Sequence, residues 1–214
     1  MLKLNIPYRC DDISTQTFIQ SMGGNMIKPI ADAEELLHLA MKASDNKNPE
    51  QSLNYLKTAL ELSPDYAEAH LMLGATYADL GMFERAEKEI KSAIKANDQL
   101  HVAHFQLGLL YITHNRTDEA ITSWTALDEL PEDNPYYLFK TGLIALANDD
   151  FENCIQYLEA GLESNQENPP LSANIEKILA SVRQSQPVEP NNVSSEKQQK
   201  SKIIKLTAYE NSDD

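Results

Sequence analysis

Histidines and cysteines are the residues of this 214-residue sequence best suited to hold a metal ion or act as nucleophiles. His101 and His104 lie three residues apart and would share a helix face, where His70 could complete a metal site. His70 and His104 are 34 residues apart, however, and this is also the period of an internal repeat. Because the repeat explains their recurrence, we predict no metal site.

The other candidates for catalysis also have simpler structural explanations. Cys10 and Cys154 are far apart in the sequence and make no disulfide framework, and Cys154 falls where each repeat has a small residue, which predicts an inert buried thiol. The pairs Glu132–Asp133 and Asp149–Asp150 fall in expected turns, where solvated carboxylates and helix caps are common. The sequence has no P-loop, nucleophile elbow, zinc-protease helix or Cys-x-x-Cys motif. We therefore expect no enzyme activity and no cofactor.

The charge balance limits the possible partners. The chain carries 33 acidic and 18 basic residues, a net charge of −15, and its pI is near 4.7. Such a charge opposes binding to the phosphates of nucleic acids. No apolar run is long enough to span a membrane, and the first residues lack the apolar core of a signal peptide. With two free thiols, these features predict an acidic, cytoplasmic protein that binds no nucleic acid and has no membrane span.

An internal repeat organises the middle of the chain. Rows of 34 residues starting at Ala33, Ala67, His101 and Pro135 align without a gap. Apolar and small residues at row positions 4, 7, 8 and 11, and again at 20, 24, 27 and 28, predict two amphipathic helices in each row. Small residues at positions 8 and 20 would let the two helices approach closely. The repeat positions with a structural role include Gly74, Tyr77, Ala86, Gly108, Tyr111, Ala120, Trp124 and Gly142.

The second and third rows resemble the tetratricopeptide repeat family. They read His70-x2-Leu73-Gly74-x2-Tyr77…Ala86-x3-Ile90 and His104-x2-Leu107-Gly108-x2-Tyr111…Ala120-x3-Trp124. The first and fourth rows depart from the pattern, with Ala43 and Ala145 in place of Tyr and Thr141 in place of Leu. The resemblance implies an all-α fold, an α-solenoid in which helix-turn-helix repeats stack into a right-handed superhelix. The expected repeats are 33–66, 67–100, 101–134 and 135–168, within a domain spanning 31–184.

Three further segments flank the repeats. A helix over 170–184, with apolar residues from Leu171 to Val182 on one side, is expected to cap the stack. Residues 1–30 form an N-terminal extension with a possible short helix at 13–22. Residues 185–214 are expected to be a disordered tail. Its basic and apolar island at 197–209 could dock into the protein's own groove, although a tail that serves only solubility is the simpler alternative.

The family resemblance also implies a concave face, built from row positions 2, 5, 9 and 12 of the first helix of each pair. In the last two rows these positions are apolar throughout, which predicts a groove for an apolar peptide or helix. They lie away from the core side of the helix, so we expect them not to hold the pair together. Packing between neighbouring repeats is the alternative. We call the expected groove residues the concave strip: Leu71, Val102, Phe105, Leu109, Ile112, Tyr136, Phe139, Leu143 and Leu146.

These features predict an adaptor or scaffold for protein–protein interaction. Family members that grip the terminal carboxylate of chaperones use Lys and Asn on this face, whereas here Leu37 and Met41 occupy the corresponding positions. A buried carboxylate would have no cationic partner, so we predict no such clamp. Two alternatives remain open: a small acidic cytosolic chaperone for a secreted protein, and an assembly scaffold that self-associates into a homo-oligomer.

Overall fold

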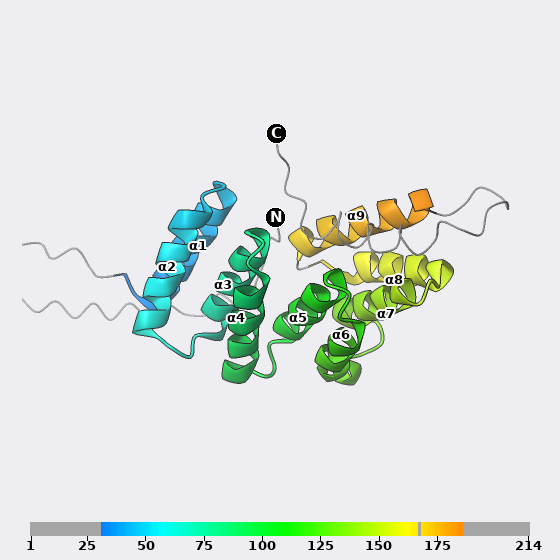
Figure 1. Cartoon of the computed structure of the whole chain (residues 1–214), viewed down its shortest axis with the longest axis horizontal. Coiled ribbons are helices and arrows are strands. Elements are labelled where there is room, and N and C mark those ends of the chain that lie inside the picture. The colour runs from blue at the N-terminus through cyan, green and yellow to red at the C-terminus, as the bar shows by residue number, and fades with distance from the viewer. Residues whose placement is uncertain (1–30, 167, 186–214) are drawn as a thin grey trace, which may run out of the picture.

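The computed structural model describes residues 31–166 and 168–185, and within these ranges the regular structure is entirely helical. Figure 1 shows the helices stacked in chain order as antiparallel pairs, which confirms the expected all-α solenoid. The expected helix at 13–22, Cys10, the tail and its island at 197–209 lie outside the described residues. The helices are α1 (Ala33–Asp45), α2 (Pro49–Leu62), α3 (Ala67–Asp79), α4 (Phe83–Ala96), α5 (His101–Thr113), α6 (Thr117–Trp124), the 3-10 helix η1 (Thr125–Glu129), α7 (Pro135–Ala147), α8 (Phe151–Ser164) and α9 (Pro169–Ser185).

The turn inside each pair has the same backbone geometry. The fifteenth residue of each row adopts a positive φ, between 56° and 71°, which reverses the chain after the first helix. The following N–H then donates to the carbonyl five residues earlier; Met82, for example, donates to Tyr77 at 2.8 Å. Only one of the four rows has glycine at this left-handed position. The four residues are Lys47, Gly81, Asn115 and Asp149.

Polar side chains cap the first turns of several helices. The Asp32 carboxylate accepts from the N–H of Glu35 at 2.8 Å, and the Asn48 side chain accepts from Gln51 at 3.1 Å, just before Pro49. Asp150, which belongs to one of the acidic pairs, caps α8 by accepting from Asn153. These bonds satisfy N–H groups that have no partner inside the helix. The acidic residue at this turn therefore has a structural role.

The first and second helices of a pair differ in how much of their surface is buried. In α5, 11 of 13 residues are buried, whereas α4 buries one stripe, Ala86, Ile90 and Ala93. A first helix packs on its own partner and on the second helix of the preceding repeat, and α5 also packs on α3 and α7, while a second helix presents its remaining side to solvent. The solenoid therefore has an inner layer of α1, α3, α5 and α7 and an outer layer of α2, α4, α6 and α8.

Glycine at row position 8 allows close contact between paired helices. A Cβ atom built on Gly108 would lie 2.1 Å from Nε1 of Trp124, and one on Gly74 would lie 2.7 Å from Cγ1 of Ile90. Neither distance is compatible with a side chain unless the neighbour moves. The glycines thus offset their unfavourable helix propensity, which is about 1 kcal/mol, by admitting a large partner residue.

The third repeat departs from the expected pair of regular helices. Its second helix, α6, ends at Trp124 after eight residues and continues as the 3-10 helix η1. Hydroxyl groups bond back to the helix carbonyls along this stretch, with Thr122 donating to Asp118, Ser123 to Glu119 and Thr125 to Thr122. Such bonds compete with the regular pattern and bend helices, which explains the break. Leu127, in η1, nevertheless remains fully buried.

The last helix, α9, buries one apolar stripe and exposes its other side, as expected of a capping helix. Asn174 is buried beside this stripe and is only 6% exposed. An ion pair between Arg183 and Glu159 joins α9 to α8. In Figure 1, α9 extends above α5, α7 and α8, with its first turn towards α5.

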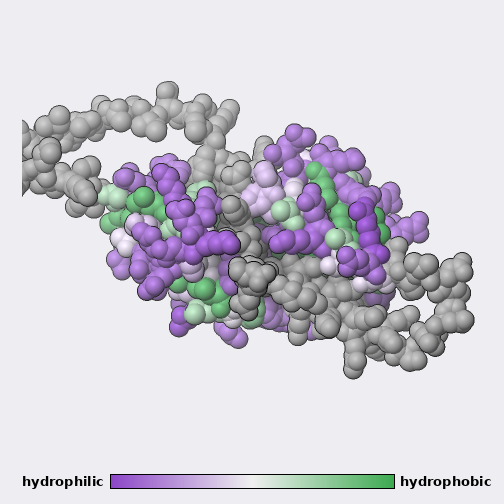
Figure 2. Space-filling model, turned by 90° about the horizontal axis from the view of Figure 1, so that it is seen from above, coloured by the Kyte–Doolittle hydropathy of each residue, from purple (hydrophilic) through white to green (hydrophobic). Residues whose placement is uncertain are grey.

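The coloured part of the surface in Figure 2 is mostly hydrophilic, with smaller hydrophobic patches between. Large apolar side chains that remain exposed are few among the residues described, and Leu62, at 52%, is the most exposed of them. No helix in the described ranges has the length and apolar content needed to cross a membrane.

Candidate peptide-binding face

The structure places the concave strip on the inner layer, where nearly all of it is buried. Leu71, Phe105 and Phe139 have no exposed surface, and Tyr136 is partly buried against the same core. The strip comes from three parallel first helices, α3, α5 and α7, so its residues recur at the repeat spacing. The other five, all at most 6% exposed, are Val102, Leu109, Ile112, Leu143 and Leu146.

Phe105 and Phe139 help to hold their helix pairs together, contrary to the sequence-based expectation for row position 5. The Phe105 ring stacks on Trp124 of α6, with centroids 6.0 Å apart, and the Trp124 indole N–H donates to the Phe105 carbonyl at 3.1 Å. Phe139 packs so closely on α8 that a Cβ atom on Gly161 would lie 2.5 Å from its ring. The expectation fails because an aromatic ring is long enough to reach the second helix from this position.

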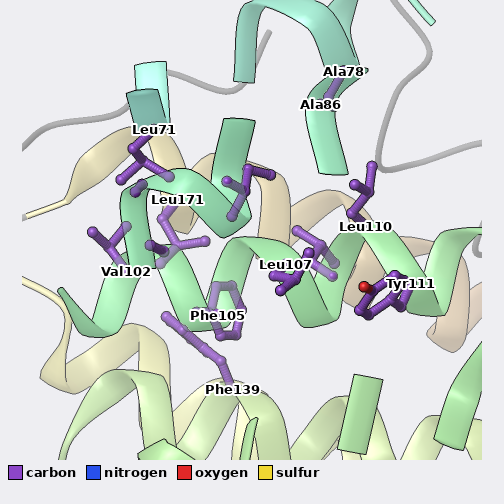
Figure 3. Packing of buried hydrophobic residues seen from close by; sticks show 14 of the residues in the cluster. Leu71, Ala78, Ala86, Val102, Phe105, Leu107, Leu110, Tyr111, Phe139 and Leu171 are labelled. Carbon is purple, nitrogen blue, oxygen red and sulfur yellow. The ribbon is translucent and has the colours of Figure 1, made fainter. Parts of the chain in front are cut away.

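Aromatic contacts also connect the third and fourth repeats. The Phe105 ring lies 5.7 Å from that of Tyr136 and 6.2 Å from that of Phe139, measured between centroids. Figure 3 shows Phe139 pointing from α7 towards Phe105 on α5. These rings form a continuous apolar layer across the repeat boundary. Packing between repeats, the alternative left open by the sequence, therefore describes part of the strip.

The start of α9 lies close to this layer. In Figure 3, Leu171 lies beside Val102 and Phe105, and all three belong to one hydrophobic cluster. Leu171 is 1% exposed, and Ile175, one turn further along α9, is fully buried. Side chains from α9 therefore share the core that the strip residues form.

The buried cation of α7 already has an acidic partner. Lys140 of α7 is 4% exposed; it forms an ion pair with Asp128, and its ammonium lies 4.8 Å from the centroid of the Tyr137 ring. This buried lysine is a feature that the sequence analysis did not single out, although it was visible as the one cation of the fourth repeat. Because Asp128 neutralises it, Lys140 is not available to grip a carboxylate from a ligand.

A polar cluster joins the second and third repeats. The Glu87 carboxylate accepts from Arg116 at 2.6 Å, from Lys91 at 2.6 Å and from the Tyr111 hydroxyl at 3.0 Å. Burial alone raises the pKa of Glu87, but these three donors outweigh it and lower the pKa from 4.5 to about 2. The Arg116 guanidinium also lies over the Tyr111 ring, 4.3 Å from its centroid. The geometry is that of a structural joint between α4 and the α5–α6 turn.

The histidines and Cys154 have structural surroundings. Nδ1 of His70 lies 2.8 Å from Glu89 and its Nε2 lies 2.9 Å from the Pro64 carbonyl, while Nε2 of His104 lies 3.0 Å from the Asp98 carbonyl. Both histidines thus tie a first helix to the loop before it. In the described part of the chain, no three His, Cys, Asp or Glu side chains gather in a way that could hold a metal ion.

Burial raises the pKa of the Cys154 thiol to about 12, so the thiolate is scarce at neutral pH.

The comparison with protein families agrees with this architecture. A tetratricopeptide repeat model matches residues 43–105, which run from the end of α1 into α5. Solved structures of such repeat solenoids superimpose on the chain, as described below. Residues 43–105 of this chain thus match the tetratricopeptide repeat family.

One curated relative of this chain is anaphase-promoting complex subunit 3 from Schizosaccharomyces pombe. The two are 24% identical over 110 residues, which make up 51% of this chain and 16% of the relative. The chain therefore spans less than a fifth of that protein's length.

Solved structures share the fold at low sequence identity. The Cut9–Hcn1 hetero-tetramer of the anaphase-promoting complex matches with a TM-score of 0.62 and 16% identity, over 72% of this chain and 30% of the matched one. MamA matches with a TM-score of 0.52 and 23% identity, over 64% and 80% of the respective chains. YrrB, described as a tetratricopeptide repeat protein with an unusual peptide-binding site, matches with a TM-score of 0.50 and 18% identity, over 72% and 79%. At these identities the matches show the fold alone.

Proposed function

We propose that this protein is a scaffold for protein–protein interaction that binds an apolar helix or peptide along the concave strip. The observation that carries the proposal is the apolar character of the inner layer, since α5 and α7 are apolar on more sides than one helix pair requires. Hydrophobic grooves lined by parallel helices are a recurring way to bind an amphipathic helix. The repeat fold, which this chain shares with the peptide-binding YrrB, supports a peptide partner.

The charges around the strip indicate what the partner would carry at its ends. Glu34 and Glu68 occupy row position 2 of the first two repeats, next to the apolar positions. No lysine or arginine occupies positions 2, 5, 9 or 12 of any repeat. The preferred ligand is therefore an apolar segment with basic flanking residues, and it is held without a grip on a terminal carboxylate.

A peptide-display selection with the full-length protein as bait tests this function. Selected peptides should be apolar with basic flanks, and Tyr136→Glu should weaken their binding at least tenfold, equivalent to about 1.4 kcal/mol. Tyr136 suits this test because it is the partly exposed member of the strip, so the variant should keep its helical circular dichroism.

Ile121→Glu is the matched control for this selection. It adds the same charge at an apolar residue of α6 that is 42% exposed on the outer layer, and it should leave binding unchanged. Equal losses in the two variants, or selected peptides with no apolar stripe, would contradict the proposed function.

A further inference from the structure

Helix α9 has the form of a ligand for the concave face. Its buried apolar residues fall at i, i+4, i+7, i+8 and i+11, the spacing with which an amphipathic helix fills a hydrophobic groove. The opposite side of the helix is exposed. The five apolar residues of this stripe are Leu171, Ile175, Ile178, Leu179 and Val182.

The position of α9 brings Leu171, the first residue of this stripe, to the strip. Leu171 lies beside Val102 and Phe105 in the close-up, and α9 extends above α5 and α7 in the view of the whole chain. The stripe and the strip belong to one hydrophobic cluster. At Val102 and Phe105, the start of α9 therefore lies over apolar surface that the proposed function assigns to a partner.

The attachment of α9 contains two unfavourable polar burials. The side-chain amide nitrogens of Asn168 and Asn174 have no hydrogen-bond partner, although these residues are only 3% and 6% exposed. A buried donor without an acceptor loses its hydration and gains nothing in return. A helix selected only to complete the core would gain stability from an apolar residue at position 174, which faces the same way as Leu171 and Ile178.

Polar contacts compensate little for this loss. Among the described residues, the ion pair that joins α9 to another helix is Arg183–Glu159, and the two side chains are 56% and 47% exposed. Ion pairs with that exposure contribute little to stability. Hydrogen bonds fix the start of α9 to the end of α8 more firmly than this ion pair does. The Asn165 amide donates to the Asn168 carbonyl and to the Ser172 hydroxyl, both at 2.8 Å.

We propose that α9 is a built-in, displaceable occupant of the concave strip, and that the partner is an amphipathic helix with the same apolar spacing, which takes its place. The inference rests on the proposed function and adds the form of the partner and its regulation. Because α9 is part of the same chain, it competes for the strip at a high effective concentration. It therefore excludes ligands that bind weakly. The unpaired amides of Asn168 and Asn174 weaken the attachment of α9 enough for a partner helix to displace it.

A cross-linking experiment on the full-length chain tests the displacement. Glu159→Cys and Arg183→Cys, combined with Cys10→Ser, place two exposed thiols on α8 and α9 for a bismaleimide, while the buried Cys154 stays unreactive. The probe is a fluorescent synthetic peptide with the sequence of residues 168–185. We expect the unlinked protein to bind the peptide and the linked protein to bind at least tenfold more weakly.

Two substitutions in α9 test the same idea without a linker. Asn174→Leu removes a buried unpaired amide, so it should tighten the closed state and weaken peptide binding about tenfold. Ile175→Ala should loosen α9 and strengthen peptide binding by a similar factor. Hydrogen exchange on the complex should show that the α9 amides of the protein lose protection when the peptide binds.

The outcomes separate this inference from the proposed function. Equal peptide binding before and after linking, with α9 still protected, would overturn the displacement of α9 and leave a binding function elsewhere intact. Absence of binding by both the α9 peptide and the display-selected peptides would overturn both.

Discussion

At the scale of single residues, the glycine at row position 8 determines how closely a pair can pack. Gly108 faces Trp124, whereas the corresponding glycines face Ile90 and Leu158. The indole is rigid, fully packed and bonded to the Phe105 carbonyl, so it cannot move away from a new methyl group. The third repeat should therefore be the least tolerant of a larger residue at this position.

We predict that Gly108→Ala destabilises the protein by about 1–3 kcal/mol, because overpacking against Trp124 outweighs the gain in helix propensity. Urea unfolding followed by circular dichroism measures the change. The same substitution in a Trp124→Leu background should cost less, since leucine fills this position opposite Gly142. If the cost is the same in both backgrounds, the contact with the indole is not its cause.

At the scale of the elements, the polar cluster around Glu87 connects α4 to α5 and α6. The pKa of Glu87 is lower in the folded state than the ordinary value of 4.5, so its contribution to stability is complete above that value. The contribution is lost as the pH falls through about 2. The shift corresponds to at most about 3 kcal/mol.

We predict that Glu87→Gln lowers the free energy of unfolding by about 1–3 kcal/mol at pH 7, because Arg116 and Lys91 lose their shared carboxylate. The difference from the unmodified protein should shrink as the pH is lowered from 5 towards 2, in denaturant titrations at several pH values. Glu163→Gln, at an exposed position of α8, is the control and should change stability little at any pH. A difference in the free energy of unfolding that grows as the pH falls would contradict the role assigned to Glu87.

At the scale of the whole molecule, the repeats form a linear stack in which each pair contacts its neighbours. The third repeat lies inside the stack and buries 11 of the 13 residues of α5, whereas α1 buries four of 13. Stability should therefore be distributed unevenly along the chain.

We predict that amide hydrogens exchange most slowly in α5, more quickly in α1 and quickly again in α9. Exchange measured by mass spectrometry on the full-length protein gives the order directly. The reason is that an inner helix opens only when both neighbouring repeats do. Uniform protection from α1 to α9 would mean that the stack opens as one unit.

The sequence by itself determined the repeat and the helix pairs. A period of 34 residues with small residues at positions 8 and 20 is a local signal, and so are a capping Asp32 and a Pro49 at a helix start. Such signals depend on neighbours a few residues away, which the sequence shows. The burial of Cys154 and Trp124 followed from their row positions for the same reason.

Only the tertiary structure decided what the inner apolar residues touch. Phe105 could have faced a ligand or Trp124, and a hydrophobic pattern is the same in both cases because it records only that a side chain avoids water. The burial of Asn174, the pairing of Lys140 with Asp128 and the course of α9 towards α5 also depend on contacts between distant segments. Periodicity within one helix carries no information about which segment covers it.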